Sequence, residues 1–574
     1  MKARTVAVRP ALGAVVAVEV AAIAAFAALP PWRFSWWPFA VITSVALVLL
    51  LVTVHRRNFA AWVWARVRHL RTRRYTTAVG AAIDIGHGSE VYGVRTDGDE
   101  AVTVIRVDGR AYEPTFLRGS TVSRTINVLP LRVLTQFLDQ PGGLRLGIDI
   151  VSDGFRVRPE SGYPQLYSTL LADRGAAGQR ITYLIVRLQI SESLPGLVYR
   201  QSIGTAVAAA TDRIIKALQQ DGVRAVALTA EEQDAVVEKL SLGLAVAPPR
   251  PAVIDPVDDG DDDPAGSDTT AQDTAHRDLR STDTPVGTPR KVRAGAEVGW
   301  SLINVQPGYV SSYYFSPEDI TTATFNQMWA LRSDRVLHVL ALRKHKDAVV
   351  MSALARTNDP RPPDEPPTLF LNTLPGDQYT AALRVAPVSR PDLPLPTGEL
   401  PQNLEIAVGS TGILIGAALR DDPSATPEIQ RDDLVMWALT DPQRPTRIVM
   451  DTSDFYVRQL LIRAAAAGER IAIYARDPRR WQSVSQPSIA VVEPHRRAEF
   501  VPTIIVNDHA PIAPPAGLAS TVITVGRVGD STPDLLFQQT SPTTVRVHTP
   551  NRGTPLDISI VQFRAEETWT GVAA

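Results

Sequence analysis

The amino-acid sequence predicts a membrane-anchored mixed α/β protein. The expected fold class is a two-helix N-terminal transmembrane hairpin followed by cytosolic mixed α/β structure, in which two lobes are joined by a disordered acidic linker. Three observations predict it: two apolar runs near the N-terminus, alternating strand-like and helix-like patterns after residue 77, and a segment at 247–296 with few apolar side chains. A chain of 574 residues has room for more than one domain beside an anchor.

The predicted anchor consists of the apolar runs 11–29 and 36–54. The first run is broken only by Glu19, and the second carries no charge. Each is about long enough to cross the ~30 Å hydrocarbon core as a helix. The loop 30–35 carries a single cation, whereas basic residues gather on both outer flanks, which the positive-inside rule places in the cytosol. We therefore expect a multi-pass plasma (inner) membrane protein with a cytosolic N-terminus at 1–10, an extracytoplasmic loop at 30–35, and most of the chain in the cytosol.

Small residues recur at every fourth position of the first run. Such a stripe lets another helix approach closely in lipid. Glu19 lies nearly opposite the stripe, and an intramembrane carboxylate usually meets a protein partner. The alternatives are that the stripe packs on the second run and that Glu19 is a tolerated neutral acid. The candidate helix-contact residues are Gly13, Ala17, Glu19, Ala21 and Ala25.

Residues 55–77 are predicted to form a basic juxtamembrane helix. Phe59, Val63, Val67 and Leu70 have helical spacing, and arginines occupy most of the remaining circumference. These cations would reach anionic headgroups, or they would serve only to fix the topology. The candidate headgroup contacts are Arg56, Arg57, Arg66, Arg68 and Arg71.

The first predicted lobe spans 78–246. Its strands are expected at 90–94, 101–107, 144–151 and 181–190, with helices at 129–138, 163–172 and 203–220. Thr229 and Glu232 have the spacing of a capping box and predict a further helix that begins there.

The second predicted lobe spans 297–574. Residues 336–343 and 348–356 have the pattern of paired strands. The segment 447–475 has the pattern strand, helix, strand, which normally forms a right-handed parallel crossover.

The linker at 247–296 is predicted to be disordered because it has almost nothing apolar to bury. The acidic cluster at 258–263 lacks the spacing and the final Glu of an EF-hand, which favours a solvated linker over a calcium site. We expect a protease to cut here first and to release two compact fragments.

Composition and motifs exclude several kinds of chemistry. With no cysteine, the chain has no disulfide, thiol nucleophile or Cys-ligated metal, and a net charge of −1 gives no basic field for nucleic acid. The loop 450–454 lacks the glycines and the lysine of a phosphate-binding loop, and the nine histidines have no metal-ligand spacing. The sequence therefore predicts no catalytic, cofactor-binding or metal-binding residue, and no cofactor.

Asp149 and Asp153 follow an apolar strand, as the acidic pair of a sugar-nucleotide site would. Their spacing is looser than the compact D-x-D form, so strand-end turn residues are the favoured interpretation.

Short segments along the chain form a recognisable combination. They follow the Arg-rich segment and comprise 90–98, 103–109, 146–152, 185–188, 206–218, 461–468 and 476–481. Together these segments resemble the EccE component of mycobacterial type VII (ESX) secretion systems. The resemblance implies a plasma-membrane core component that assembles with EccB, EccC and EccD, of which EccC is the motor ATPase. It provides no catalytic residues, and the long acidic linker and extended second lobe depart from the family pattern.

We therefore predict a non-enzymatic structural subunit of a membrane secretion complex. The main alternative is a membrane-anchored enzyme, such as an envelope glycosyltransferase. A third possibility is a regulatory module that recruits a soluble partner through its acidic linker.

Overall fold

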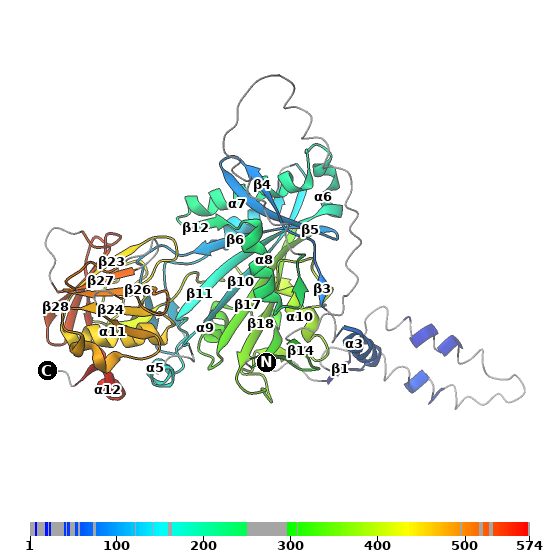
Figure 1. Cartoon of the computed structure of the whole chain (residues 1–574). Coiled ribbons are helices and arrows are strands. Elements are labelled where there is room, and N and C mark those ends of the chain that lie inside the picture. Colours follow the sequence, from blue (N-terminus) through cyan, green and yellow to red (C-terminus); the bar gives the residue numbers. More distant parts are fainter. Residues whose placement is uncertain are drawn as a thin grey trace, which may run out of the picture.

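The computed structural model (Figure 1) describes residues 58–72, 76–120, 122–140, 142–158, 163–248, 296–306, 308–493, 496–515, 521–526 and 532–571, with short pieces before residue 58. Within these residues the body of the protein consists of two large sheets with helices packed on them. The helices are α3 (Phe59–Thr72), α4 (Leu131–Gln136), α5 (Pro164–Leu171), α6 (Ile190–Leu197), α7 (Ile203–Gln220), α8 (Ala230–Ser241), α9 (Thr322–Met328), α10 (Gln378–Arg384), α11 (Asp454–Ala466) and α12 (Glu567–Thr570).

The first sheet has 14 strands within the described residues, in the order β14-β15-β16-β18-β17-β10-β11-β6-β5-β4, with four short strands attached at its sides. Its main strands are β4 (Ile83–His87), β5 (Glu90–Asp97), β6 (Glu100–Asp108), β10 (Leu144–Phe155), β11 (Gln179–Gln189), β14 (Ala296–Val298), β15 (Ile303–Val305), β16 (Tyr309–Phe315), β17 (Arg335–His345) and β18 (Ala348–Asp359). The attached strands are β9 (Asp139–Gln140), β12 (Arg224–Ala227), β19 (Leu371–Thr373) and β20 (Gly398–Glu399).

The predicted division into two lobes is wrong. β10 precedes the segment 249–295 and β17 follows it, yet the two strands pair antiparallel from Gly147↔Arg343 to Gly154↔Val336. A second strand pair also joins the two predicted lobes. β7 (Thr115–Arg118), from the first predicted lobe, pairs with β22 (Leu434–Trp437) in the second sheet. Strand pairing joins segments far apart in sequence, so a change in local composition did not mark a boundary between folding units.

Among the described residues, the second sheet has 12 strands in the order β25-β24-β26-β27-β23-β28-β29-β30-β21-β22-β7-β8. The predicted unit at 447–475 is present as β23, α11 and β24, with parallel β27 and β26 inserted between the two strands. The strands not yet placed are β8 (Val122–Arg124), β21 (Ile413–Ala418), β23 (Thr446–Asp451), β24 (Ile471–Ala475), β25 (Ile489–Val492), β26 (Ile504–Asp508), β27 (Thr521–Val525), β28 (Leu535–Ser541), β29 (Thr544–His548) and β30 (Leu556–Ser559). Apart from these sheets, β3 (Thr77–Ala78) pairs parallel with β13 (Ala245–Val246).

The predicted transmembrane hairpin is also corrected. Val52 to Val54, which the sequence placed at the end of a helix, form β2 and pair antiparallel with β1 (Val6–Val8). β-branched residues such as these favour strands. Most of 11–29 and 36–54, and all of 30–35, lie outside the described residues, as does the acidic linker. In the part of the chain that the structure describes, no helix combines the length and the apolar character needed to cross a membrane.

Both faces of the first sheet are buried, because successive side chains of its strands enter different cores. On β6, Ile105 and Val107 contact the core beneath α7, whereas Val102 and Val104 contact the core beneath α8 and α10. Two sequence predictions are confirmed here: α7 spans Ile203–Gln220, and α8 begins with a capping box between Thr229 and Glu232.

Pairing across the 249–295 segment makes a prediction about cleavage. A chain cut at a protease site inserted in this segment should elute as one species in size-exclusion chromatography and separate only in denaturant. Separation would unpair β10 from β17 and β7 from β22 and expose the buried sheet faces. Two fragments that elute apart under native conditions would contradict the continuous sheet, and the uncut chain provides the reference volume.

His338 on β17 fixes α9 against the sheet. Its ring stacks on Phe325 with a centroid distance of 4.9 Å and meets Trp329 edge-on at 5.4 Å. Burial, helped by the nearby Arg180 cation, lowers the pKa of His338 from 6.5 to about 3. The folded protein therefore holds this imidazole neutral at pH values where the unfolded chain would protonate it.

Stability should consequently fall as the pH drops from about 6.5 toward 3, by at most about 1.4 kcal/mol per pH unit. His338→Phe keeps an aromatic ring and removes the titrating group, so this variant should lose that part of the slope. Urea unfolding between pH 7 and 5 measures the effect. His345→Phe, at the exposed end of the same strand, should keep the wild-type slope, and equal slopes in wild type and His338→Phe would contradict the assignment.

Candidate functional site

Strand register gathers arginines around one buried aspartate. Gly147 on β10 lies directly opposite Arg343 of β17 on one side and Arg187 of β11 on the other. Because glycine has no side chain, both arginines can extend over it toward Asp149, two residues further along β10 on the same face. An added Cβ at Gly147 would lie 3.6 Å from the Arg343 side chain.

Arg187 connects three strands to the segment that follows α10. Its Nε donates to Asp149 Oδ2 at 2.7 Å, and its Nη1 donates to Glu100 Oε2 on β6 at 3.0 Å. The same guanidinium also donates to two backbone carbonyls, Ala386 O at 2.8 Å and Val388 O. A fully buried cation needs this many partners, because an unmatched charge in the interior is strongly destabilising.

Two further arginines reach Asp149 from the other side. Arg384, the last residue of α10, donates to Asp149 Oδ2 at 3.2 Å, and Arg390 donates to Asp149 Oδ1. The Arg390 backbone N–H also donates to Glu100 Oε2 at 3.0 Å. We call Asp149, Glu100, Arg187, Arg384 and Arg390 the arginine cluster.

The charges in this cluster shift one another's pKa. Burial alone would raise the pKa of Asp149, but Arg384 and Arg187 outweigh it and hold this pKa below its usual value. Burial opposes the charged form of Arg187, yet Asp149 and Glu100 raise its pKa. For Arg384 burial lowers the pKa, and repulsion from Arg187 and Arg343 adds to that effect against the pull of Asp149. Asp149 and Arg187 therefore carry their charges at neutral pH, and the cations around Asp149 are crowded.

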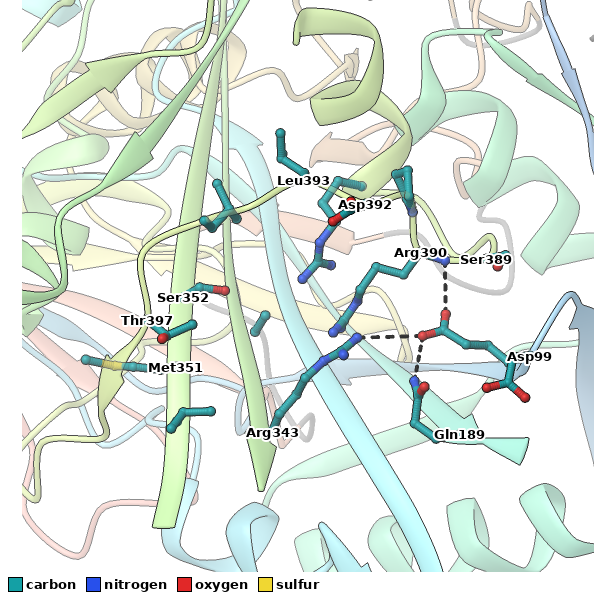
Figure 2. Close-up of a pocket in the computed structure, with 16 residues that line it drawn as sticks. Asp99, Gln189, Arg343, Met351, Ser352, Ser389, Arg390, Asp392, Leu393 and Thr397 are labelled. Atoms are coloured by element: carbon teal, nitrogen blue, oxygen red, sulfur yellow. Dashed lines mark hydrogen bonds and ion pairs between the residues drawn. The ribbon is translucent and has the colours of Figure 1, made fainter. Parts of the chain in front are cut away.

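A cavity of about 450 Å³ opens beside the arginine cluster (Figure 2). Arg343, Arg384, Arg390, Glu100 and Gln189 form its charged and amide wall. Hydroxyls of Ser352, Ser389 and Thr397 and the apolar side chains of Met351 and Leu393 complete the lining. A volume of this order suits a small organic molecule.

Asp149 and Asp153, for which the sequence favoured strand-end turn residues over a sugar-nucleotide pair, both lie inside β10. Asp149 is occupied by the arginine cluster. Asp153 accepts from Arg335 Nε at 2.6 Å and forms an ion pair with Lys239 at 3.1 Å. Both carboxylates are buried and matched by cations, so they hold strands and helices together.

The predicted basic helix is observed as α3, with one face against the protein body. Trp62 and His69 pack on Trp300, at centroid distances of 6.0 and 5.4 Å. Arg68 forms an ion pair with buried Asp377, the residue that precedes α10. Arg66 lies over the Trp300 ring at 5.1 Å, and Arg71 is exposed near the end of the helix.

The remaining predicted contact residues are placed only in part. Glu19 is described and exposed. Gly13, Ala17, Ala21, Ala25, Arg56 and Arg57 lie outside the described residues.

Sequence reasoning missed the arginine cluster. The available signal was a single charged residue inside an apolar strand, as at Arg187 and at Asp149, because such residues are buried only when paired. Which charges pair depends on strand register and on the loop after α10, and no local pattern specified either.

Together, the fold and the site define a class of protein: a mixed α/β scaffold whose interior charges are matched between strands and the helices packed on them. Among the described residues no group of three or more His, Asp or Glu side chains is placed to hold a metal ion.

Comparison with known proteins gives this scaffold a family. A family model described as "Putative type VII ESX secretion system translocon, EccE" matches residues 176–277. The ESX-2 secretion system protein EccE2 of Mycobacterium tuberculosis is 27% identical over 464 residues, which is 80% of this chain and 73% of that protein. The ESX-5 secretion system protein EccE5 is 25% identical in Mycobacterium marinum, over 66% of this chain and 87% of that protein. EccE5 of Mycobacterium tuberculosis is 24% identical over 70% of this chain and 93% of that protein. The predicted resemblance is confirmed: the family model and these relatives support an EccE component of type VII secretion.

The arginine cluster should be essential for stability. Asp149→Asn leaves Arg187, Arg384 and Arg390 without their shared counter-charge and should lower the free energy of unfolding by about 3–5 kcal/mol. Asp139→Asn is the matched control, because Asp139 pairs with Lys344 at a partly exposed site and should cost at most about 1 kcal/mol. Urea unfolding compares the two variants. Equal losses would show that the cluster does not carry this role.

Proposed function

We propose that this chain is a non-enzymatic structural subunit of a plasma-membrane ESX secretion complex, in which it assembles with EccB, EccC and EccD. The observation that carries the proposal is the extent of the similarity to EccE2, which covers 80% of the chain. The buried charged side chains pair with one another inside the fold, and this supports a role that is not enzymatic. Asp149 and Asp153, the acidic pair that an envelope glycosyltransferase would need free, are both engaged with cations, and this disfavours the enzyme alternative.

The outer face of α3 suits contact with the membrane or with a membrane subunit. Its apolar side chains point away from the body, with Phe59, Val63, Trp64 and Leu70 exposed by 55%, 48%, 61% and 49%. At 100° per residue, Phe59, Val63 and Leu70 form one stripe, flanked by Arg66 and Arg71. An apolar stripe bordered by arginines is typical of helices that lie in an anionic interface.

Contacts on the inner face of α3 would fix the orientation of the protein body relative to the membrane. The ion pair from Arg68 to Asp377 and the packing of Trp62 on Trp300 join the helix to the start of α10 and to the first sheet. In Figure 1, α3 lies at the end of the molecule away from the C-terminal sheet. We therefore place the second sheet, with α11 and α12, away from the membrane on the cytosolic side.

Two further assignments belong to the proposal. Gly13, Ala17, Ala21 and Ala25, with Glu19, are proposed as contacts to a partner helix. Arg56, Arg57, Arg66 and Arg71 are proposed as headgroup contacts, while Arg68 divides its charge between that role and Asp377.

The test is purification of the tagged, full-length chain from membranes of its own host in mild detergent, with identification of the proteins that accompany it. Integral-membrane type VII subunits should co-purify. Trp64→Ser combined with Leu70→Ser removes apolar area from the outer face of α3 and should lower the yield of complex severalfold, while the thermal transition of the chain stays unchanged.

Val198→Ser combined with Tyr199→Ser is the matched control, because these side chains are also exposed and apolar but lie after α6. This control should leave the yield unchanged. Recovery of the chain alone from intact membranes would refute the subunit proposal. Equal yields from the α3 variant and the control would refute only the role of α3.

A further inference from the structure

Several arginine and carboxylate side chains meet at the wall of the cavity beside the arginine cluster. Four guanidinium groups, those of Arg187, Arg343, Arg384 and Arg390, share two buried carboxylates, Asp149 and Glu100. Two other carboxylates line the cavity, Asp99 and Asp392. Both are exposed. The two buried carboxylates are therefore shared among four arginines, which leaves some guanidinium N–H groups without an acceptor in the part of the chain that the structure describes.

Arg343 is the cation with the weakest match. Its Nη2 lies 3.6 Å from Glu100 Oε1, which is an ion pair but not a hydrogen bond. Neither its Nε nor its Nη2 has a hydrogen-bond partner among the described residues, and the same is true of Arg390 Nε. Figure 2 shows the side chains of Arg343 and Arg390 extending toward the same space. Two guanidinium groups that converge in this way form a common binding arrangement for an oxyanion.

The rest of the lining indicates the size and character of the bound molecule. At about 450 Å³ the cavity is larger than a single inorganic anion requires. In Figure 2, Ser352 and Thr397 lie beside Met351 on one side of the cavity, Gln189 lies on the opposite side, and Leu393 lies near Asp392. This combination suits a compact organic body with a few polar groups, attached to the anionic end.

We propose that this cavity binds a small phosphate-bearing molecule, with its phosphate against the guanidinium groups of Arg343 and Arg390. Binding supplies the hydrogen-bond acceptors that Arg343 Nε, Arg343 Nη2 and Arg390 Nε lack among the described residues. The site involves no catalysis and does not depend on membership in a secretion complex. The oxyanion could be free phosphate or the phosphate of an organic molecule, and the probes distinguish these sources.

The experiment measures binding to the purified full-length chain in detergent by isothermal titration calorimetry. The probes are inorganic phosphate, glycerol 3-phosphate and adenosine monophosphate, each at constant ionic strength set with sodium chloride. At least one probe should bind saturably. Tighter binding of an organic probe would identify an organic phosphate as the ligand, whereas binding of inorganic phosphate alone would identify the free ion.

Variants locate the site. Arg343→Gln should weaken binding by at least about tenfold, because it removes a charge-assisted contact, and Arg343→Lys should recover part of the loss. Arg343 is partly exposed and only loosely paired, so both variants are expected to fold, and their thermal transitions report this. Arg546→Gln, which removes a partly exposed arginine from the second sheet, is the matched control and should bind as wild type.

Absence of saturable binding by all three probes would overturn the proposal. Equal affinity in wild type and a folded Arg343→Gln would also overturn it. Either result would leave the subunit proposal intact, because complex membership is measured by co-purification.

Discussion

The buried guanidinium of Arg187 is the constraint on which the arrangement of the first sheet and its covering helices depends. A cation without access to water must be met by charges and by hydrogen-bond acceptors. Here these come from β10, from β6 and from the segment after α10. The register of β10 against β11 and the position of α10 on the sheet are therefore specified together. A shift of one residue in the register of β10 would move Asp149 to the opposite face.

Ion pairs of the same kind also link elements that lie further from Arg187. α10 ends in Arg384, which enters the arginine cluster, and begins after Asp377, which pairs with Arg68 of α3. Buried pairs also join other helices to the elements packed against them. Arg95 of β5 pairs with Asp234 of α8 at 2.5 Å, and Arg463 of α11 pairs with Glu566 at 2.8 Å. A buried ion pair is often no more stabilising than an apolar replacement. We therefore attribute to these pairs the selection of one packing arrangement, not a gain in stability.

The segments that carry the family resemblance contain many of these same charges. Asp149 lies within 146–152, Arg187 within 185–188, and Arg463 within 461–468. Local patterns around them predicted α7, the capping box of α8 and the β17–β18 pair, because periodicity and capping depend on neighbours in sequence. The two sheets were not predicted, since β10 with β17 and β7 with β22 are pairings between distant segments. The outer stripe of α3 was recognised, but the inner face was not, because Trp62 and His69 acquire their role only from Trp300.

The cavity follows from the way the cluster is built. Gly147 leaves space in the sheet for arginines on both neighbouring strands, and that space brings Arg187 and Arg343 to one face in the same row. Asp149 accepts from three arginines, and Arg343 is not among them. Glu100, already bonded to Arg187 and Gln189, holds Arg343 only loosely. The register that secures Arg187 thus leaves Arg343 at the cavity wall without a full partner, and an anion that enters the cavity would supply one.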